Sequence, residues 1–139
     1  MTTNTLDHLK RLNHDWIAAF NRRDWSAETA IRTPDFTAVL SGAPGPLNAE
    51  AWNGFMQAFT TAFPDSKITI DECIAEGNLV ATRWSLTGTH QAEFQGIPAT
   101  GRSIQFHGLE FNRVEGDQFA EHWSMFDNVS LLRQLGVLN

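Results

Sequence analysis

The spacing of the apolar residues changes once along the chain, and this change constrains the fold more than any other feature. Before Asp65, apolar side chains recur every three or four residues, which is the period of an amphipathic helix. After Asp65 they alternate with polar side chains, which is the period of a β-strand. Helices followed by a run of strands favour an α+β domain. At 139 residues, the chain predicts a single domain over residues 1–139.

Two long helices and two short ones are predicted. One long helix precedes residue 21, and the other begins at Asn48, a good N-cap, and ends at Phe63 before Pro64. Short helices are predicted over residues 26–32, where Pro34 stops the helix, and over residues 129–135. The apolar stripes that indicate the two long helices are Leu9, Leu12, Trp16 and Phe20, and then Trp52, Phe55, Met56, Phe59 and Phe63.

Four strands are predicted after Asp65, and turns join them. In the first strand Ile68, Ile70 and Ile74 alternate with Thr69, Asp71 and Cys73. Gly77-Asn78 is typical of a two-residue hairpin turn before a strand over residues 79–87. The last two strands, 103–114 and 119–125, flank a loop at residues 115–117. We expect this meander to curl around the helices and to leave a cone-shaped apolar pocket.

Composition excludes several classes of protein. The net charge is -6 and the basic residues are scattered, so we expect no nucleic-acid partner. Cys73 is the only cysteine, and no Cys/His set has zinc spacing, so no metal site is predicted. No apolar run approaches the roughly 20 residues of a membrane span. Residues 1–11 are polar and lack a signal-peptide core, so a cytoplasmic protein is expected.

The last hairpin brings an acid and a base to one face of the sheet. A three-residue loop at 115–117 would pair Val114 with Gln118, and stepping back would place Glu110 opposite His122. Residues opposed in this way have Cβ atoms about 4.5–5.5 Å apart. We predict that Glu110 fixes the tautomer of His122 and raises its pKa, while His122 moves the proton. Two other interpretations stay open: a buried polar pair that only satisfies itself, and a pair in solvent at the mouth of the cone.

Other residues of the same face are predicted to bind the substrate. By this register, Gly108 lies opposite Ser124 and Phe106 opposite Phe126, so Ser124 would orient the substrate. The apolar side chains predicted to shape the pocket are Trp84, Phe106, Phe126 and Phe59. On the opposite face, Leu109, Phe111, Trp123 and Met125 form a second apolar surface with His107 and Glu121. Because helices cover only one side of the sheet, this surface predicts a homodimer interface.

A series of short motifs runs along the chain in this order: Ala62-Phe-Pro-Asp65, Ala75-Glu-Gly77, Gly88-Thr-His90, Gly96-Ile-Pro98, Thr100-Gly-Arg102, Glu121-His-Trp123, Asp127 and Leu132-Arg-Gln-Leu-Gly136. This ordered series resembles the SnoaL-like polyketide cyclases, also called ester cyclases, of the NTF2-like superfamily. The resemblance covers nearly the whole chain. It implies a cone-shaped α+β barrel, a curved antiparallel sheet with helices on its concave side, a homodimer, and no metal or organic cofactor.

The resemblance carries over the fold but not the catalytic residues. The founding cyclases close a ring by aldol condensation, with an Asp as general acid/base helped by His, Gln and Asn. Counted back from Leu132–Gly136, the Asp falls on Ser124, the His on Glu110 and the Gln on Gly108. The Asn, aligned through Thr33-Pro-Asp35, falls on Ala38. This chain therefore lacks all four residue types at these positions.

Three functions follow from this reading. The leading prediction is a cofactor-free acid/base enzyme of the cyclase or isomerase type, acting on a small hydrophobic carbonyl compound. An epoxide-type hydrolase of the same fold would need two carboxylates flanking an arginine, for which Arg83 and Asp127 are candidates. A non-catalytic protein that binds small hydrophobic ligands would need only the pocket.

Overall fold

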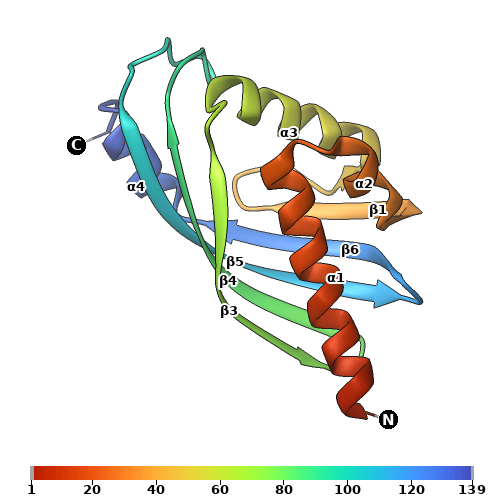
Figure 1. Cartoon of the computed structure of the whole chain (residues 1–139). Coiled ribbons are helices and arrows are strands. Elements are labelled where there is room, and N and C mark those ends of the chain that lie inside the picture. The colour runs from red at the N-terminus through yellow and green to blue at the C-terminus, as the bar shows by residue number, and fades with distance from the viewer. Residues whose placement is uncertain (1, 139) are drawn as a thin grey trace.

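The apolar stripe of the first segment forms α1 (Thr2–Arg22), a helix that crosses the concave side of a curved sheet (Figure 1). The computed structural model describes residues 2–138, with side chains from residue 5 onward. The short helix α2 (Trp25–Ala30) follows α1, and its N-cap Asp24 accepts a hydrogen bond from the amide of Ala27. The stripe residues of α1 are buried as predicted: Leu9, Leu12, Trp16 and Phe20.

The third helix forms where its capping residue predicts it. In α3 (Ala49–Ala62) the side chain of Asn48 accepts a hydrogen bond from the amide of Ala51 at 2.8 Å. This bond satisfies one of the free amides of the first turn. Trp52 and Phe59 are buried beneath the helix. The predicted helix and its N-cap are therefore confirmed.

The four predicted strands lie side by side in one sheet and run antiparallel. Gly77, with a φ of 61°, lies in the tight turn between β3 and β4, as the sequence predicts. The strand order is β2-β1-β6-β5-β4-β3, so the sheet curves without closing. The strands are β1 (Arg32–Leu40), β2 (Leu47–Asn48), β3 (Lys67–Glu76), β4 (Leu79–Thr89), β5 (Ser103–Glu115) and β6 (Gln118–Phe126).

β1 and β2 are additions to the prediction, and β1 runs parallel to β6. The helix predicted over residues 26–32 ends at Ala30 because the chain then becomes extended. Pro34 does not simply stop a helix. It lies inside β1, in the stretch between Arg32 and Thr37 where the pairing register shifts. Proline is tolerated there because it lacks the amide that a regular ladder would use.

The predicted alternation of the first strand fails at Ile74. Ile68 and Ile70 are half-buried, but Ile74 is 63% exposed. The pairing of β3 with β4 shifts between Ile70 and Glu72, which adds one residue to β3. An added residue reverses the faces of every residue that follows. Cys73 therefore points inward in place of Ile74 and packs on the core.

The chain ends in α4 (Asn128–Gln134), whose N-cap is Asp127. Its carboxylate accepts a hydrogen bond from the amide of Ser130 at 3.0 Å. Gly136 follows with a φ of 86°, a conformation that suits glycine at a helix end. No helix within residues 2–138 is long and apolar enough to cross a lipid bilayer.

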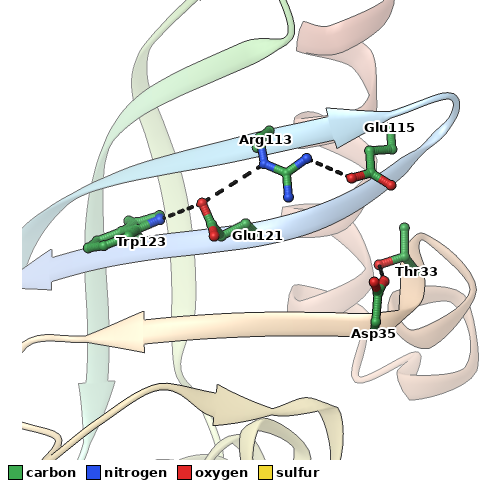
Figure 2. Close-up of polar contacts among 6 residues, drawn as sticks. All are labelled: Thr33, Asp35, Arg113, Glu115, Glu121 and Trp123. Carbon is green, nitrogen blue, oxygen red and sulfur yellow. Dashed lines mark hydrogen bonds and ion pairs between the residues drawn. The ribbon is translucent and has the colours of Figure 1, made fainter.

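The outer face of the sheet is apolar at its centre and charged beside it. Phe111 lies opposite Trp123, which is 49% exposed. Figure 2 shows the charged border: the indole N–H of Trp123 donates to Glu121 at 2.9 Å, and Arg113 ion-pairs with Glu115 and Glu121. We name the exposed set Leu109, Phe111, Trp123 and Met125 the outer apolar patch. Its predicted position, on the face opposite Glu110, is confirmed.

Candidate functional site

A cavity lies between the inner face of the sheet and the helices α1 and α3. Its volume, measured as the space open to the centre of a water molecule, is about 90 Å³. This is several times the volume that one water molecule needs. Its walls are mostly aromatic and aliphatic. The polar side chains at its wall, apart from tryptophan indoles, are Glu28, Glu110, His122 and Ser124.

The strand register arranges the cavity in levels. At one level His122 lies opposite Asn112, and at the next level along the strands Ser124 lies opposite Glu110. Gly108 pairs with Phe126 one level further along. Along the inner face of β5 and β6, the polar side chains therefore gather at two successive levels, and Phe126 lies at the next.

The predicted pairing of Glu110 with His122 is wrong by two residues. The turn holds only Gly116 and Asp117, so Glu115 pairs with Gln118 and the register moves by one. A bulge at Ala120 moves it by one more. Two single-residue shifts restore the original faces, because side chains alternate with period two. The prediction that Glu110, His122 and Ser124 share one face is therefore confirmed, while their partners are not.

Asn112 stands between the two predicted catalytic residues and joins them. Its Nδ2 donates to Glu110 Oε2 at 3.1 Å and to Asn13 Oδ1 at 2.9 Å. Its Oδ1 lies 2.7 Å from Nδ1 of His122. Asn13 in turn donates to the hydroxyl of Thr82 at 2.6 Å. The result is a buried polar network that links β4, β5, β6 and α1.

This network fixes the tautomer of His122. The amide nitrogen of Asn112 faces two acceptors, so its carbonyl oxygen must face the imidazole. A carbonyl oxygen can only accept, so Nδ1 of His122 carries the proton. Nε2 is then left with a lone pair, and within residues 2–138 it makes no hydrogen bond. Asn112 therefore fixes the tautomer of His122, the role that the sequence-based prediction gave to Glu110.

Burial shifts the two titrating groups in opposite senses. It raises the pKa of Glu110 to about 7, and the hydrogen bond from Asn112 only partly opposes the shift. It lowers the pKa of His122 to about 3, so the imidazole is neutral at physiological pH. The predicted rise in the pKa of His122 is therefore wrong, because no carboxylate contacts the ring. Glu110 is the group whose charge changes near neutrality.

The side chains predicted to bind substrate all line the cavity. The rings of Phe106 and Phe126 are 5.9 Å apart, although Phe126 pairs with Gly108 instead of Phe106. Trp84 packs edge-on against Phe106 at 5.9 Å. The full predicted set is at the wall: Ser124, Trp84, Phe106, Phe126 and Phe59. Their role in binding stays a prediction.

Gly108 makes room for Trp84. A Cβ built on Gly108 would lie 2.1 Å from the indole of Trp84, which no side chain tolerates. Gly108→Ala should therefore displace the indole and destabilise the fold by about 1–3 kcal/mol. Chemical denaturation would measure this change. Gly54→Ala is the matched control, since nothing lies near that position in α3, and it should be neutral or stabilising. Equal stability of both variants would contradict the packing of Trp84 on Gly108.

Glu28 is a cavity residue that the sequence does not reveal. It is buried in α2, and its Oε1 accepts from the indole N–H of Trp52 at 3.1 Å. Burial raises its pKa, while Trp52 and the charge of Arg32 oppose the rise. Its helix is too short to show a periodic pattern. No signal in the sequence marks Glu28 as inward-facing.

The residues considered for a hydrolase lie outside the cavity. Arg83 is on the outer face of β4, where it ion-pairs with Asp71 and Glu72. Asp127 is exposed and caps α4. Arg83 therefore lies beside two carboxylates, but outside the cavity, and Asp127 is not one of them. Among residues 2–138, no three His, Cys, Asp or Glu side chains come together as a metal site.

Residues 10–135 match the family described as SnoaL-like polyketide cyclase. The chain belongs to the SnoaL-like polyketide cyclase family. Its structure is similar to that of IdmH, a proposed polyketide cyclase from Streptomyces antibioticus, with a TM-score of 0.83 and 35% identity. That alignment covers 93% of this chain and 99% of IdmH. The predicted family and fold class are thus confirmed.

Another similar structure is described by a different activity. AclR, a proposed hydroxylase from Streptomyces galilaeus, is 30% identical with a TM-score of 0.89, covering 96% of this chain and 99% of AclR. TsrD from Streptomyces laurentii is 24% identical to this chain, with a TM-score of 0.83. The alignment covers 95% of this chain and 97% of TsrD, and at this identity it shows the fold alone. No curated protein gives a significant match. Similarity to these structures therefore does not fix the reaction.

The four positions carried over from the SnoaL-like cyclases gather on the inner face. Ala38 pairs with His122 across β1 and β6, and Gly108, Glu110 and Ser124 lie on the adjoining strands. Only Glu110 and Ser124 offer a polar side chain there. This SnoaL-like chain keeps a polar group at two of the four positions, and both differ in type from the family's residues.

Proposed function

We propose that this SnoaL-like protein is a cofactor-free acid/base enzyme that moves a proton on a small hydrophobic carbonyl compound. The observation that supports it is a buried carboxylate, Glu110, at the wall of an apolar cavity with a pKa of about 7. A base whose pKa lies near the operating pH combines a useful ionised fraction with useful basicity. Cyclisation and isomerisation both begin with such a proton transfer.

In this proposal Glu110 is the catalytic residue. Its carboxylate takes a proton from the carbon next to the carbonyl group, and the resulting carboxylic acid returns the proton to the product. The free atom Oε1 faces no partner within residues 2–138, so it can meet the substrate. Asn112 holds the other oxygen, Oε2, and so fixes the direction of the carboxyl group.

His122 and Ser124 act on the same substrate without changing charge. The neutral ring of His122 offers Nε2 as an acceptor for a substrate hydroxyl group. Ser124 lies opposite Glu110 and offers a hydroxyl that can donate or accept. We expect both residues to orient the substrate, whereas the sequence-based prediction made His122 the proton carrier.

Proton exchange tests the proposal without knowledge of the natural substrate. In deuterium oxide, the protein should bind 2-acetylnaphthalene and accelerate exchange of its acetyl protons, followed by proton NMR. Binding without exchange would favour a ligand-binding protein. If the protein neither binds hydrophobic ketones and esters of this size nor accelerates their proton exchange, the proposal is contradicted.

A non-catalytic ligand-binding protein is the second candidate. The observation that favours it is the loss of all four cyclase residue types on the inner face. In that case Glu110, Asn112 and His122 would serve only to satisfy one another's hydrogen bonds. The exchange experiment separates the two functions, because a binding protein would leave the rate unchanged.

We further propose that two copies of the chain pair through the outer apolar patch. Large exposed apolar surfaces mark interaction sites, and helices leave this face of the sheet uncovered. Trp123→Glu should yield monomers in sedimentation, because an apolar interface cannot bury an unpaired charge without a large penalty. Val137→Glu, at an exposed residue beyond the sheet, is the control and should leave the assembly unchanged. A Trp123→Glu dimer would place the interface elsewhere.

A further inference from the structure

The free polar atoms at the cavity wall are almost all hydrogen-bond acceptors. Oε2 of Glu28, Oε1 of Glu110 and Nε2 of His122 form no hydrogen bond within residues 2–138, and packing does not seal them from a water-sized molecule. An ionised carboxylate and the bare nitrogen of a neutral imidazole can only accept. The hydroxyl of Ser124, which is also free, can do either. Among residues 2–138, no lysine or arginine lines the cavity.

The tryptophans of the wall do not supply the missing donors. The indole N–H of Trp52 already donates to Glu28. The indole nitrogens of Trp16 and Trp84 are sealed by packing, so a ligand in the cavity does not reach them. Because buried acceptors are costly to leave unpaired, a ligand that fits this wall has to bring donors of its own.

Glu28 is the free acceptor that stands apart from the proposed reaction. It comes from α2, whereas Glu110, His122 and Ser124 come from β5 and β6. The bond from Trp52 holds Oε1 at 3.1 Å and so fixes the carboxylate, which leaves Oε2 for a ligand. The residue is only 3% exposed. A carboxylate buried to this extent is costly unless a donor or a cation meets it.

Arg32 is the cation whose charge acts on Glu28, but its N–H groups turn elsewhere. Its Nε donates to the backbone carbonyl of Glu28, and its Nη2 donates to Thr29 and Asn53. Its Nη1 is buried without a partner among residues 2–138. Burial outweighs the charge of Arg32 and raises the pKa of the Glu28 carboxyl. A second cation that touches the carboxylate would therefore stabilise its ionised form.

Aromatic rings make up much of the remaining wall, among them Phe20, Trp52, Phe55 and Phe59. The faces of such rings attract cations, and an ammonium group offers three donors and no acceptor.

We infer that the cavity takes a hydrophobic carbonyl compound that also carries a protonated amine, with the ammonium group on Oε2 of Glu28 and the reacting carbon at Glu110. The inference rests on the proposed function, since it names the substrate class of the same site. A neutral hydroxyl group would satisfy Oε2 but would not bring the positive charge that the carboxylate lacks.

Three probes of one shape test this inference by calorimetry at pH 7: 2-ethylnaphthalene, 2-naphthalenemethanol and 2-naphthylmethylamine. They differ only in ending in a methyl, a hydroxyl or an ammonium group. The intact protein should bind the amine roughly 10–100-fold more tightly than the hydrocarbon, the value of a hydrogen bond to a charged group, and the alcohol should lie between them. Glu28→Gln keeps a carbonyl oxygen for Trp52 and places an amide nitrogen where Oε2 was. It should abolish the preference for the amine and change the affinity for the hydrocarbon by less than about 3-fold.

Glu76→Gln is the control, because it removes an exposed carboxylate at the end of β3, and its preference for the amine should equal that of the intact protein. A preference that survives in Glu28→Gln but disappears in Glu110→Gln would place the cation on Glu110 and overturn the inference. Equal binding of all three probes by the intact protein would also overturn it, while proton exchange on 2-acetylnaphthalene would leave the proposed function standing. Failure of every probe to bind would overturn the inference and count against the proposed function as well.

Discussion

Glu110→Gln should lower the rate of carbonyl proton exchange by roughly 10²–10⁴-fold, the usual contribution of a positioned acid or base. Glutamine has the same shape as the protonated acid, and its carbonyl oxygen can still accept from Asn112. The fold and the cavity should therefore persist. In the intact protein, kcat/KM should rise with pH and level off above about 7, because the ionised carboxylate is the base. The variant should lose this limb.

Glu76→Gln provides the control, since Glu76 is an exposed carboxylate at the end of β3. Its rate and pH profile should match those of the intact protein. Circular dichroism and a melting curve would establish that Glu110→Gln is folded before its rate is compared. An exchange rate that survives in Glu110→Gln, with the limb near pH 7 intact, would remove Glu110 from the mechanism.

The second large effect concerns stability, because the two buried groups respond to pH in opposite directions. Glu110 binds its proton more tightly in the folded state. Its contribution to the free energy of unfolding therefore falls as pH rises from 4.5 to about 7. This loss amounts to about 3 kcal/mol. His122 binds its proton less tightly when folded, so its contribution is lost as pH falls from 6.5 to about 3. That loss amounts to about 5 kcal/mol.

In the intact protein, the slopes of unfolding free energy against pH that come from Glu110 and His122 cancel between pH 4.5 and 6.5. Variants that lack one of the two groups should reveal them. Relative to the intact protein, Glu110→Gln should gain about 3 kcal/mol of unfolding free energy between pH 4 and pH 8. His122→Asn should likewise gain about 5 kcal/mol between pH 7 and pH 3. Urea denaturation at each pH measures both differences. If neither difference in unfolding free energy varies with pH, then burial does not favour the protonated form of Glu110 or the neutral form of His122.

The sequence predicts which face a residue occupies better than it predicts the residue's neighbour. The predicted hairpin register placed Glu110, His122 and Ser124 on one face, and this placement survives a register error of two residues because faces repeat every two residues. The neighbour depends on turn length and on a bulge at Ala120, and neither leaves a clear pattern in the residues. Two shifts of one residue each left the side chains on their predicted face, but together they moved the cross-strand partners by two positions.

Other parts of the site depend on contacts between distant segments. Asn13 lies on α1 and meets Asn112 only because the helix crosses the sheet at that level. Glu28 turns inward for a similar reason, through its bond to Trp52. The strand β1 does show alternation, with Phe36 and Ala38 buried, but Pro34 suggested a stop instead. Long-range packing decided these features, and a pattern along the chain does not encode it.

The parallel pairing of β1 with β6 has a consequence for how the cavity is made. Ala38 meets His122, so one wall of the site joins a strand near the start of the chain to a strand near its end. Contacts between such distant segments close large loops and form slowly. The hairpins β3–β4 and β5–β6 need only local contacts. During folding, the antiparallel meander can therefore assemble first, and the pocket acquires its full enclosure only when β1 docks along β6.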